Sequence, residues 1–481
     1  MLREPQVKDW RQEKLNPTII VIFGITGDLS HRKLLPALYY LIKNDLLPPN
    51  TKIIGVSRHD VDLDKLMASV RETLKNNHQD CDEPSISKFS KMLSMHKMNL
   101  TSKDDYASLK SHLNKIEDDL GVCLNRLFYL AIPPTVLTHI IENLGVSGLA
   151  EGCQHGKANS RLLLEKPFGF DKLSAQELIL TNSKYFNEDQ IFRIDHYIAK
   201  ETVQNILSFR FQNPIFESIW NAKHISYIEI VALEKIDIEN RSIFYEQTGA
   251  LRDLTQSHLL QLLATIAMEE PVSLHSEDIH LSKQNLLKSI VPIYPNNLDQ
   301  QAIRGQYEGY KQEVNNPKSF VETFAGLKLY INTTRWHNVP FFIKTGKAMS
   351  EKKTQIRIHF KPKNPNNDKT NDLYINIQPN EGIELILWAK KPGFLSHLNK
   401  VNMSFLYQQA YDEYGHPNAY ERVLVDAIKG DQSLFASSEE ILSSWQILEP
   451  VIDKWDSVGD GLQTYKKGSN GPTMPKNWPS P

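Results

Sequence analysis

The stretch Thr18-Ile-Ile-Val-Ile-Phe-Gly-Ile-Thr-Gly-Asp-Leu29 decides the fold of the first half of the chain. Its opening run, up to the first glycine, is apolar and rich in β-branched residues, which is typical of a strand buried on both faces of a parallel sheet. Gly24 and Gly27 then form a turn, and a helical pattern with an early Pro36 continues toward Asn44. A strand, a glycine turn and a helix direct backbone amides at a phosphate, so the turn favours a nucleotide site. The G-x-x-G spacing alone could equally mark any tight turn between a strand and a helix.

Further strand patterns follow and alternate with helical ones. The strand patterns lie at 52–56, 127–132, 161–164 and 191–194, and the helical patterns between them include 103–119 and 135–144. This alternation predicts a Rossmann-like doubly wound sheet, whose ligands bind at the carboxyl ends of the strands. Lys166 and Asp195 follow two of these strands and are therefore candidate site residues. An exposed lysine before a turn is the alternative for Lys166.

The residue after the second strand bears on the choice of coenzyme. A fold of this kind that binds NAD usually offers an acidic residue here for the ribose hydroxyls. This chain has Arg58 instead, which suits a 2′-phosphate and favours NADP. Asp60 keeps NAD open, and Arg58 could also be an ordinary exposed loop residue.

The pattern changes near residue 200. We expect a helix at 198–209, a strand at 225–233 and one long helix at 249–268. Patterns at 326–333, 354–360, 373–378 and 383–389 read as strands, the last three alternating like antiparallel ones, and the tail from Gly459 is expected to be loose. The chain is thus predicted to be α/β plus α+β. A Rossmann-like domain occupies 1–197, and a larger α+β domain with a mostly antiparallel sheet occupies 198–481.

Composition narrows the class of protein. The 481 residues exceed one ordinary core, and 40% hydrophobic with 23% charged residues fits a soluble globular protein. A net charge of −2 gives no general attraction to nucleic acid or anionic membrane, and no apolar run reaches membrane-spanning length. The 3 cysteines are too few for a disulfide framework and lack metal-ligand spacing. We therefore expect a reducing, cytoplasmic location and no metal.

The stretch Asp195-His-Tyr-Ile-Ala-Lys200 concentrates chemically active groups. If the chain turned helical at His196, then His196 and Lys200 would share a face, and two cationic donors suit a phosphate. Asp195, at a strand end, could orient a base. An ordinary helix start explains the same residues, with Asp195 as N-cap and Lys200 in solvent.

His258 lies within the apolar stripe of the helix expected at 249–268. Periodicity alone favours a core histidine with one satisfied hydrogen bond. The alternative is a base in a partly dry pocket, where an imidazole with a near-neutral pKa suits proton abstraction.

Six short sequence motifs follow one another along the chain. They are Gly24-x-x-Gly27-Asp28-Leu29-x-x-Arg32-Lys33-Leu34-x-Pro36-Ala37-Leu38-Tyr39, Glu165-Lys166-Pro167-Phe168-Gly169, Arg193-Ile-Asp-His-Tyr-x-x-Lys200-Glu201, Leu251-Arg252-Asp253-Leu254-x-Gln256-x-His258, Thr345-Gly346-Lys347 and Gln378-Pro379-x-Glu381-Gly382. With their order and gaps, these blocks resemble the glucose-6-phosphate dehydrogenase family over nearly the whole chain.

The resemblance implies oxidation of glucose 6-phosphate to 6-phosphoglucono-1,5-lactone, with hydride transfer to NADP, as the first step of the oxidative pentose phosphate pathway; NAD stays open as the alternative coenzyme. It implies that His258 is the general base and that Asp195 orients it. The implied phosphate ligands are His196, Tyr197, Lys200 and Lys352. The implied ligands of the sugar hydroxyls and neighbouring oxygens are Lys166, Glu234, Asp253, Lys347 and Gln378. The implied coenzyme-binding residues are Gly24, Thr26, Gly27, Asp28, Leu29 and Arg58, together with Lys166.

Further expectations follow from the same resemblance. We expect a cis peptide bond before Pro167 and a homodimer or homotetramer formed through the sheet of the second domain. Ser257, Lys344 and Asn470 depart from the usual family pattern, which bears on coenzyme preference, substrate affinity and tail packing. Two other functions stay open: a different NAD(P)-dependent sugar dehydrogenase, which would not need a phosphate clamp, and a sugar-phosphate sensor, which would not need a base.

Overall fold

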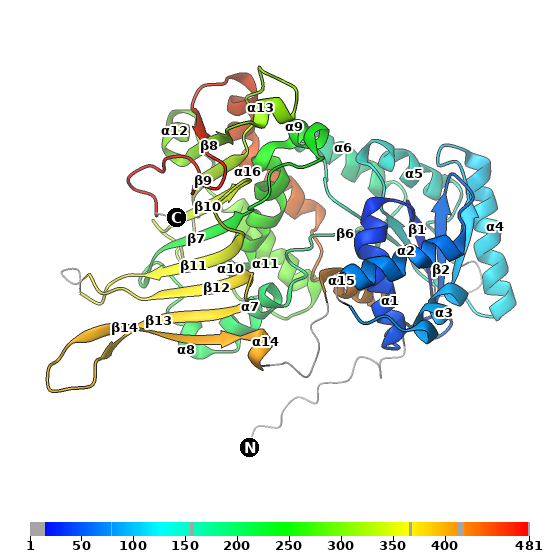
Figure 1. Ribbon diagram of the computed structural model, residues 1–481, viewed down its shortest axis with the longest axis horizontal. Coiled ribbons are helices and arrows are strands. Elements are labelled where there is room, and N and C mark those ends of the chain that lie inside the picture. Colours follow the sequence, from blue (N-terminus) through cyan, green and yellow to red (C-terminus); the bar gives the residue numbers. More distant parts are fainter. Residues whose placement is uncertain (1–14, 78, 154–157, 365–367, 411–417, 480–481) are drawn as a thin grey trace. The chain divides into compact units, whose positions relative to one another are not determined.

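The computed structural model describes residues 15–77, 79–153, 158–364, 368–410 and 418–479 (Figure 1). The chain divides into two compact units. The first contains residues 1–169, 173–199 and 417–438, and the second contains residues 170–172, 200–416 and 439–481. The chain thus returns to the first unit late in the sequence, which the sequence patterns do not indicate. The functional division at 1–197 and 198–481 stays a prediction.

A six-stranded parallel sheet forms the centre of the first unit. Its strands are β1 (Thr18–Phe23), β2 (Lys52–Ser57), β3 (Leu93–Lys97), β4 (Asn125–Leu130), β5 (Ser160–Leu164) and β6 (Ile191–Arg193). They are arranged β3-β2-β1-β4-β5-β6, which is the order of a doubly wound dinucleotide-binding fold. The predicted fold class is therefore confirmed for this unit. The sequence patterns miss β3, because none of its residues is β-branched or aromatic apart from a histidine ring.

Helices cover both faces of this sheet. On one face, α1 (Leu35–Lys43), α2 (Leu63–Asn76), α3 (Glu83–Met92) and α15 (Ala419–Lys429) share a core with Ile20 and Ile22 of β1. On the other face, the ring of Tyr106 in α4 (Lys103–Leu120) stacks 6.5 Å from that of Phe23. Successive side chains of a strand point to opposite faces, so β1 must be apolar throughout. The remaining helical segments are α5 (Pro134–Val146), α6 (Lys172–Ser183) and a short 3-10 turn, η3 (Glu188–Gln190).

A nine-stranded sheet dominates the second unit (Figure 1). Its strands are β7 (Ile225–Leu233), β8 (Ala302–Tyr307), β9 (Phe324–Tyr330), β10 (Pro340–Gly346), β11 (Lys353–Phe360), β12 (Asp372–Gln378), β13 (Gly382–Lys390), β14 (Leu398–Leu406) and β15 (Leu462–Tyr465). Their order is β14-β13-β12-β11-β7-β10-β9-β8-β15. Only the pairs β7/β10 and β8/β15 are parallel among these described strands, so the predicted, mostly antiparallel sheet is confirmed.

The helices of the second unit correct two expectations. α7 (Glu201–Phe211) begins three residues later than expected. The helix expected at 249–268 is three segments: α9 (Ser242–Ala250), a π-helical segment η4 (Leu251–Leu259) and α10 (Leu260–Ala267). The helix is interrupted at Gly249, whose φ of 60° and ψ of −175° are not helical. The other helical segments are α8 (Pro214–Glu217), α11 (Ser276–Lys288), η5 (Pro295–Asn297), α12 (Leu298–Gln301), α13 (Tyr310–Glu313), α14 (Tyr407–Ala410) and α16 (Ser438–Ser457).

The tail is also more ordered than expected. β15 joins the edge of the nine-stranded sheet beside β8. Tyr465 and Trp478 are buried in the core of the second unit. The expectation of a loose tail is therefore wrong, because composition alone did not reveal these aromatic anchors.

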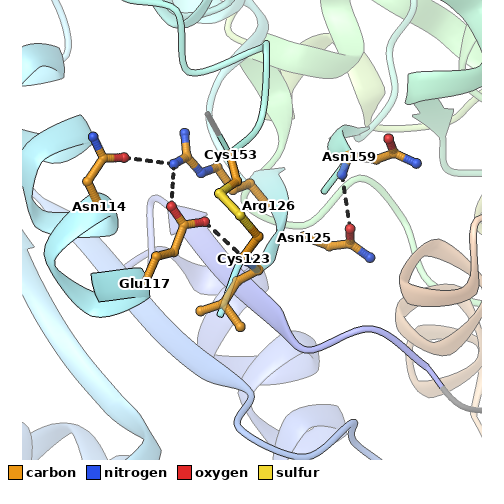
Figure 2. The surroundings of a disulfide bond; sticks show 8 residues. Asn114, Glu117, Cys123, Asn125, Arg126, Cys153 and Asn159 are labelled. Atoms are coloured by element: carbon orange, nitrogen blue, oxygen red, sulfur yellow. Dashed lines mark hydrogen bonds and ion pairs between the residues drawn. A yellow bond between two sulfur atoms is a disulfide. The ribbon is translucent and has the colours of Figure 1, made fainter. Parts of the chain in front are cut away.

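A disulfide joins Cys123 to Cys153 in the first unit (Figure 2). Beside it, Glu117 and Arg126 form a buried ion pair with an N···O distance of 2.8 Å. This bond corrects the expectation that the cysteines stay reduced, and it removes the support that cysteine usage gave to a cytoplasmic location. Spacing could not reveal the pair, because a fold brings distant cysteines together.

Candidate functional site

The predicted coenzyme turn lies between β1 and the helix that follows it. Gly24 has a φ of 81°, and a Cβ there would lie 2.3 Å from the carbonyl oxygen of Ala131, so only glycine fits. The carbonyl oxygen of Gly24 accepts hydrogen bonds from the Gly27 N–H and the Ser30 hydroxyl, both at 2.9 Å. The sequence thus specifies a tight turn whose amides lie at the end of a buried strand, where a phosphate would bind.

The helix after this turn opens with a π-helical segment, η2 (Ser30–Leu34), and continues as α1. Pro36 lies in the first turn of α1, as the sequence predicts. Thr26 and Asp28 are exposed and Leu29 is half-buried. The carboxylate of Asp28 lies 3.6 Å from the Arg32 guanidinium.

Arg58 and Asp60 lie at the carboxyl end of β2, as predicted. Both are exposed. The Asp60 carboxylate accepts a hydrogen bond of 2.6 Å from Lys97, which lowers the pKa of Asp60. The acid that could serve an NAD ribose is thus engaged by a lysine, while the arginine that suits a 2′-phosphate reaches into solvent.

Lys166 follows β5, and its bond to Pro167 is cis, which confirms that expectation. The preceding residue, Glu165, accepts a 2.5 Å hydrogen bond from the Tyr129 hydroxyl. Burial raises the pKa of Glu165 to about 7. Lys166 therefore stands beside a carboxyl group that is partly protonated near neutral pH.

Asp195 is buried just after β6, and its Oδ1 accepts the Tyr197 N–H at 2.9 Å. The residues that follow form a turn, and Lys200 precedes the first residue of α7. The chain therefore does not turn helical at His196, and the condition under which His196 and Lys200 would share a helical face is not met. The carboxylate of Asp195 instead accepts a hydrogen bond within the turn. The rings of His196 and Tyr197 lie 5.0 Å apart.

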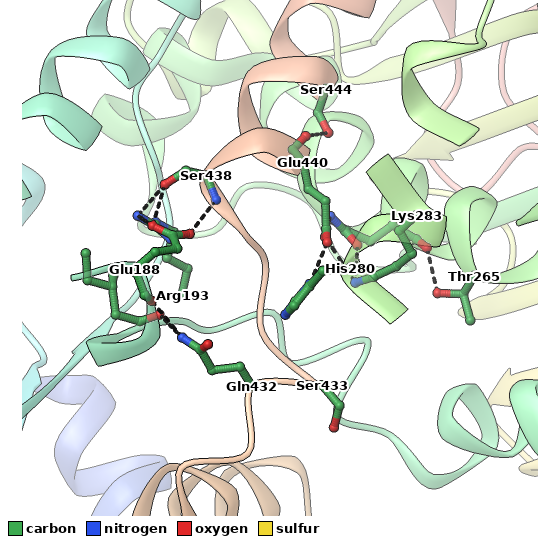
Figure 3. A network of polar contacts seen from close by, with 12 residues as sticks. Glu188, Arg193, Thr265, His280, Lys283, Gln432, Ser433, Ser438, Glu440 and Ser444 are labelled. Atoms are coloured by element: carbon green, nitrogen blue, oxygen red, sulfur yellow. Dashed lines mark hydrogen bonds and ion pairs between the residues drawn. The ribbon is translucent and has the colours of Figure 1, made fainter. Parts of the chain in front are cut away.

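A polar network of the first unit holds β6 in place (Figure 3). The buried Arg193 guanidinium donates to Glu188 at 2.7 Å and to the Ser438 hydroxyl at 2.7 Å. That hydroxyl donates to the second oxygen of Glu188 at 2.8 Å. We call Glu188, Arg193 and Ser438 the β6 anchor, because they fix the strand that delivers Asp195.

In the second unit, β7 and β10 bring two predicted residues together. These strands are parallel neighbours, and Glu234 and Lys347 each follow the last paired residue. Lys347 and Glu234 form an ion pair with an N···O distance of 2.5 Å. The Lys347 ammonium also lies 5.7 Å from the ring of Tyr245. Burial and then the nearby charge of Asp253 raise the pKa of Tyr245, so Asp253 belongs to the same cluster.

His258 lies in the π-helical segment η4 and is fully buried. This segment packs against β7, β9 and β10. In a π-helix, residues five apart are offset by little more than one turn, so Asp253 and His258 lie on about the same side of η4. In an ordinary α-helix residues five apart lie on different sides, so α-helical periodicity did not group Asp253 with His258.

A second polar network holds the helix that continues from His258 (Figure 3). The buried carboxylate of Glu440 accepts from Gln261 at 2.8 Å, pairs with Lys283 at 3.0 Å and contacts His280 Nδ1 at 2.6 Å. Lys283 also donates to the Gln261 side-chain oxygen at 3.1 Å. We call Gln261, His280, Lys283 and Glu440 the α10 anchor.

Lys200 and Gln378, predicted as substrate ligands, contact each other. The Lys200 ammonium donates to Gln378 Oε1 at 2.7 Å and lies 4.0 Å from Glu381. Burial lowers the pKa of Lys200, Glu381 opposes this, and the charge of Lys352 adds to the lowering. Lys200 thus feels the charge of a second lysine, and such a pair favours a nearby anion. Glu381 and Tyr245 were not predicted as members of these clusters, and neither lies on a periodic pattern that would have revealed it.

The predicted residues are therefore divided between the units. The coenzyme turn, Arg58, Lys166, Asp195, His196 and Tyr197 belong to the first. Lys200, Glu234, Asp253, His258, Lys347, Lys352 and Gln378 belong to the second. The pairing of Asp195 with His258 stays a prediction. Within the described ranges, no cluster of side chains could hold a metal ion, and no helix is long and apolar enough to cross a bilayer.

Comparisons with known proteins cover both halves of the chain. Residues 21–205 match the family model "Glucose-6-phosphate dehydrogenase, NAD binding domain", and residues 207–479 match "Glucose-6-phosphate dehydrogenase, C-terminal domain". Glucose-6-phosphate 1-dehydrogenase of Chlamydia muridarum is 38% identical over 94% of this chain and 93% of its own length. The Bacillus subtilis enzyme of that name is 38% identical over 94% and 95%.

A solved structure of a glucose-6-phosphate dehydrogenase, in complex with its substrate glucose 6-phosphate, gives a TM-score of 0.88. It is 34% identical and covers 96% of this chain and 96% of its own. Sequence and fold agree over nearly the full length, and the chain belongs to the glucose-6-phosphate dehydrogenase family.

Proposed function

We propose that the protein oxidises glucose 6-phosphate to 6-phosphoglucono-1,5-lactone, with hydride transfer to NADP. The observation that carries this proposal is the family match across both halves of the chain. The imidazole of His258, the carboxylate of Asp195 and the lysines Lys166, Lys200 and Lys347 stand in the sequence motifs that resemble this family. When bound, the nicotinamide ring supplies the hydride acceptor.

His258 is the proposed general base, which removes the proton of the anomeric hydroxyl as the hydride leaves. Its burial favours this role, because a dry site strengthens every electrostatic interaction with the developing charge. Asp195 is the proposed partner that orients the imidazole and stabilises its protonated form. A base and a hydride acceptor suffice for this oxidation, so no metal is required.

Lys200 and Lys352, with His196 and Tyr197, are the proposed phosphate ligands. The depressed pKa of Lys200 supports this, since a phosphate dianion would relieve both the burial and the lysine repulsion. Lys166, Glu234, Asp253, Lys347 and Gln378 are the proposed ligands of the sugar hydroxyls. The paired Glu234 and Lys347 offer an acceptor and a donor side by side, which suits neighbouring hydroxyl groups.

NADP is the proposed coenzyme. The turn from Gly24 to Leu29 would hold its pyrophosphate, and Lys166 would lie near the nicotinamide end. Arg58 is exposed for a 2′-phosphate, while Asp60 is occupied by Lys97. We expect Arg58→Ala to raise the KM for NADP about tenfold, the value of one charged contact, and to leave the KM for NAD unchanged. Equal changes for both coenzymes would remove the 2′-phosphate assignment.

A homodimer or homotetramer is proposed through the outer strands of the nine-stranded sheet. β14 is an edge strand whose Leu398, Val401 and Met403 are 45%, 40% and 62% exposed. An exposed apolar edge of this length is normally covered. Light scattering of a Val401→Glu/Met403→Glu variant should give a smaller species than the parent protein, and an unchanged mass would contradict this surface.

The direct test is coenzyme reduction with glucose 6-phosphate and with glucose, each with NADP and with NAD. We expect kcat/KM for glucose to be lower by at least about a thousandfold, because a free sugar leaves the lysine cluster without its dianion. Equal efficiency would favour a dehydrogenase of unphosphorylated sugars. Binding of glucose 6-phosphate without any turnover would favour a sensor.

A further inference from the structure

The π-helical segment that carries His258 begins in an unusual way. α9 is interrupted at Gly249, so the amides of Ala250, the N-cap of η4, and of Leu251, its first residue, have no preceding helical turn to donate to. Both are satisfied by one residue from a distant part of the sequence. The Ala250 N–H donates to the main-chain oxygen of Glu322 at 3.0 Å, and the Leu251 N–H donates to Glu322 Oε1 at 2.9 Å.

The Glu322 carboxylate lies close against Gly249. A Cβ at Gly249 would lie 2.4 Å from Glu322 Oε1 and 2.9 Å from Oε2. Glycine is therefore required both by its φ of 60° and by the approach of this carboxyl group. Glu322 is 5% exposed, and its side chain lines a cavity of ≈ 250 Å³ with Gly249, Arg252 and Glu246.

We propose that Glu322 is a positioning residue, which fixes the first turn of η4 and so sets the direction of the Asp253 and His258 side chains. The inference rests on the proposed function, in which His258 is the base. A π-helix has i→i+5 hydrogen bonds and more residues per turn than an α-helix, so a change to α-helical bonding would alter the direction of each side chain. Conversion would rotate His258 relative to Asp253. By fixing the amides of Ala250 and Leu251, Glu322 determines at which residue the π-helical hydrogen-bonding pattern begins.

The state of Glu322 supports a role as hydrogen-bond acceptor rather than as a charge. Burial raises the pKa of Glu322 to about 7, although its bond from Leu251 and the charges of Arg252 and Arg304 oppose the rise. The facing hydroxyls of Tyr245 and Tyr310 add no positive charge. A neutral carboxyl keeps an acceptor oxygen, so a glutamine should replace it.

The test compares Glu322→Ala with Glu322→Gln in the full chain. We expect Glu322→Ala to lower kcat about 30- to 100-fold, the usual effect of misplacing a catalytic group by about 1 Å, while KM for glucose 6-phosphate changes less than about threefold. Glu322→Gln should restore kcat to within about threefold of the parent protein. Glu246→Ala is the matched control, since this glutamate lines the same cavity but bonds to Ser319 and not to η4; its kcat should stay within about threefold of the parent.

Gly249→Ala disturbs the same junction by a second route, because its methyl group displaces the Glu322 carboxylate and its backbone is strained at a φ of 60°. Its loss of kcat should be at least as large as that of Glu322→Ala. If Glu322→Ala does not fold, Gly249→Ala and Glu322→Gln still decide the matter.

The inference is overturned if Glu322→Ala or Gly249→Ala keeps a normal kcat, or if Glu322→Gln is as impaired as Glu322→Ala. His258→Asn separates this outcome from failure of the proposed function. If His258→Asn keeps normal turnover, the base assignment itself is wrong. If His258→Asn is inactive while Glu322→Ala turns over normally, only the positioning role of Glu322 is lost.

Discussion

The β6 anchor and the α10 anchor perform the same task in different ways (Figure 3). Each is an ion-pair network that holds an element next to a proposed catalytic residue: β6 precedes Asp195, and α10 follows the segment that carries His258. In the β6 anchor, the side chain of Glu188 is 50% exposed. In the α10 anchor, Glu440 is 0% exposed and its partner Lys283 is 2% exposed.

This difference in burial decides how much each network can contribute to the stability of the fold. Water can replace a lost partner of Glu188, so the β6 anchor should tolerate change. No water replaces a lost partner of Glu440, and breaking the pair would leave Lys283 as an uncompensated buried charge. Hydrogen bonds of similar length in the two anchors therefore need not contribute equally to the free energy of unfolding.

The largest effect should come from Glu440→Gln. It keeps the shape but removes the countercharge of Lys283, so we expect the free energy of unfolding to fall by about 3–5 kcal/mol. Urea unfolding monitored by tryptophan fluorescence measures this. The control is Glu439→Gln, which breaks an exposed pair with Lys288 and should cost less than about 1 kcal/mol. Similar losses in both variants would contradict the claim that burial decides the energy.

Acid pH should reduce the difference in unfolding free energy between the parent protein and Glu440→Gln. Burial raises the pKa of Glu440, but Lys283 and His280 outweigh it and lower the pKa to about 2. Because the folded-state pKa is depressed, its stabilising effect is full above the unfolded pKa of about 4.3 and is lost as pH falls toward 2. The gap in unfolding free energy between the parent protein and Glu440→Gln should therefore narrow between pH 5 and pH 3. A constant gap over this range would mean that Glu440 does not act through its charge.

A smaller effect is expected from Glu188→Gln in the β6 anchor. Burial opposes ionisation of Glu188, but Arg193 and Ser438 prevail and lower its pKa. Since the carboxylate is half exposed, we expect a loss of only about 1 kcal/mol in unfolding free energy. Denaturation under the conditions used for Glu440→Gln gives a direct comparison. A loss as large as that of Glu440→Gln would show that solvent does not screen the β6 anchor.

Lys200→Ala is expected to change substrate affinity rather than stability, and it tests whether Lys200 is a phosphate ligand. It should raise the KM for glucose 6-phosphate about ten- to thirtyfold by removing one charge-assisted contact, while kcat changes little. Initial-rate kinetics measure both constants, with Lys353→Ala as the control on a neighbouring exposed pair. If only kcat fell, Lys200 would not be a phosphate ligand.

The features that the sequence predicts well are local. The coenzyme turn, Lys166 after β5 and the parallel sheet follow from runs of β-branched residues and from glycines at fixed positions. The features that it misses depend on distant contacts. Cys123 and Cys153 are 30 residues apart in the sequence. Glu322 is 71 residues from Leu251, whose N–H it accepts.

The helix around His258 shows why periodicity failed there. The hydrophobic pattern at 249–268 is compatible with one continuous α-helix, but the structure has a break at Gly249 followed by a π-helical segment. The Glu322 carboxylate lies against Gly249 and accepts the Leu251 N–H, a contact that a hydrophobic pattern cannot reveal. At His196 the chain forms a turn in which the Asp195 carboxylate accepts the Tyr197 N–H, so no helix begins there.

The central claim is that His258 is the base, and one measurement tests it most directly. It is the turnover and the substrate affinity of His258→Asn, determined together by steady-state kinetics and by calorimetric binding of glucose 6-phosphate. We expect kcat to fall by about 10³-fold or more while the Kd for the sugar phosphate stays within about threefold. A variant that binds the sugar phosphate and still turns over at near the parent rate would contradict the claim.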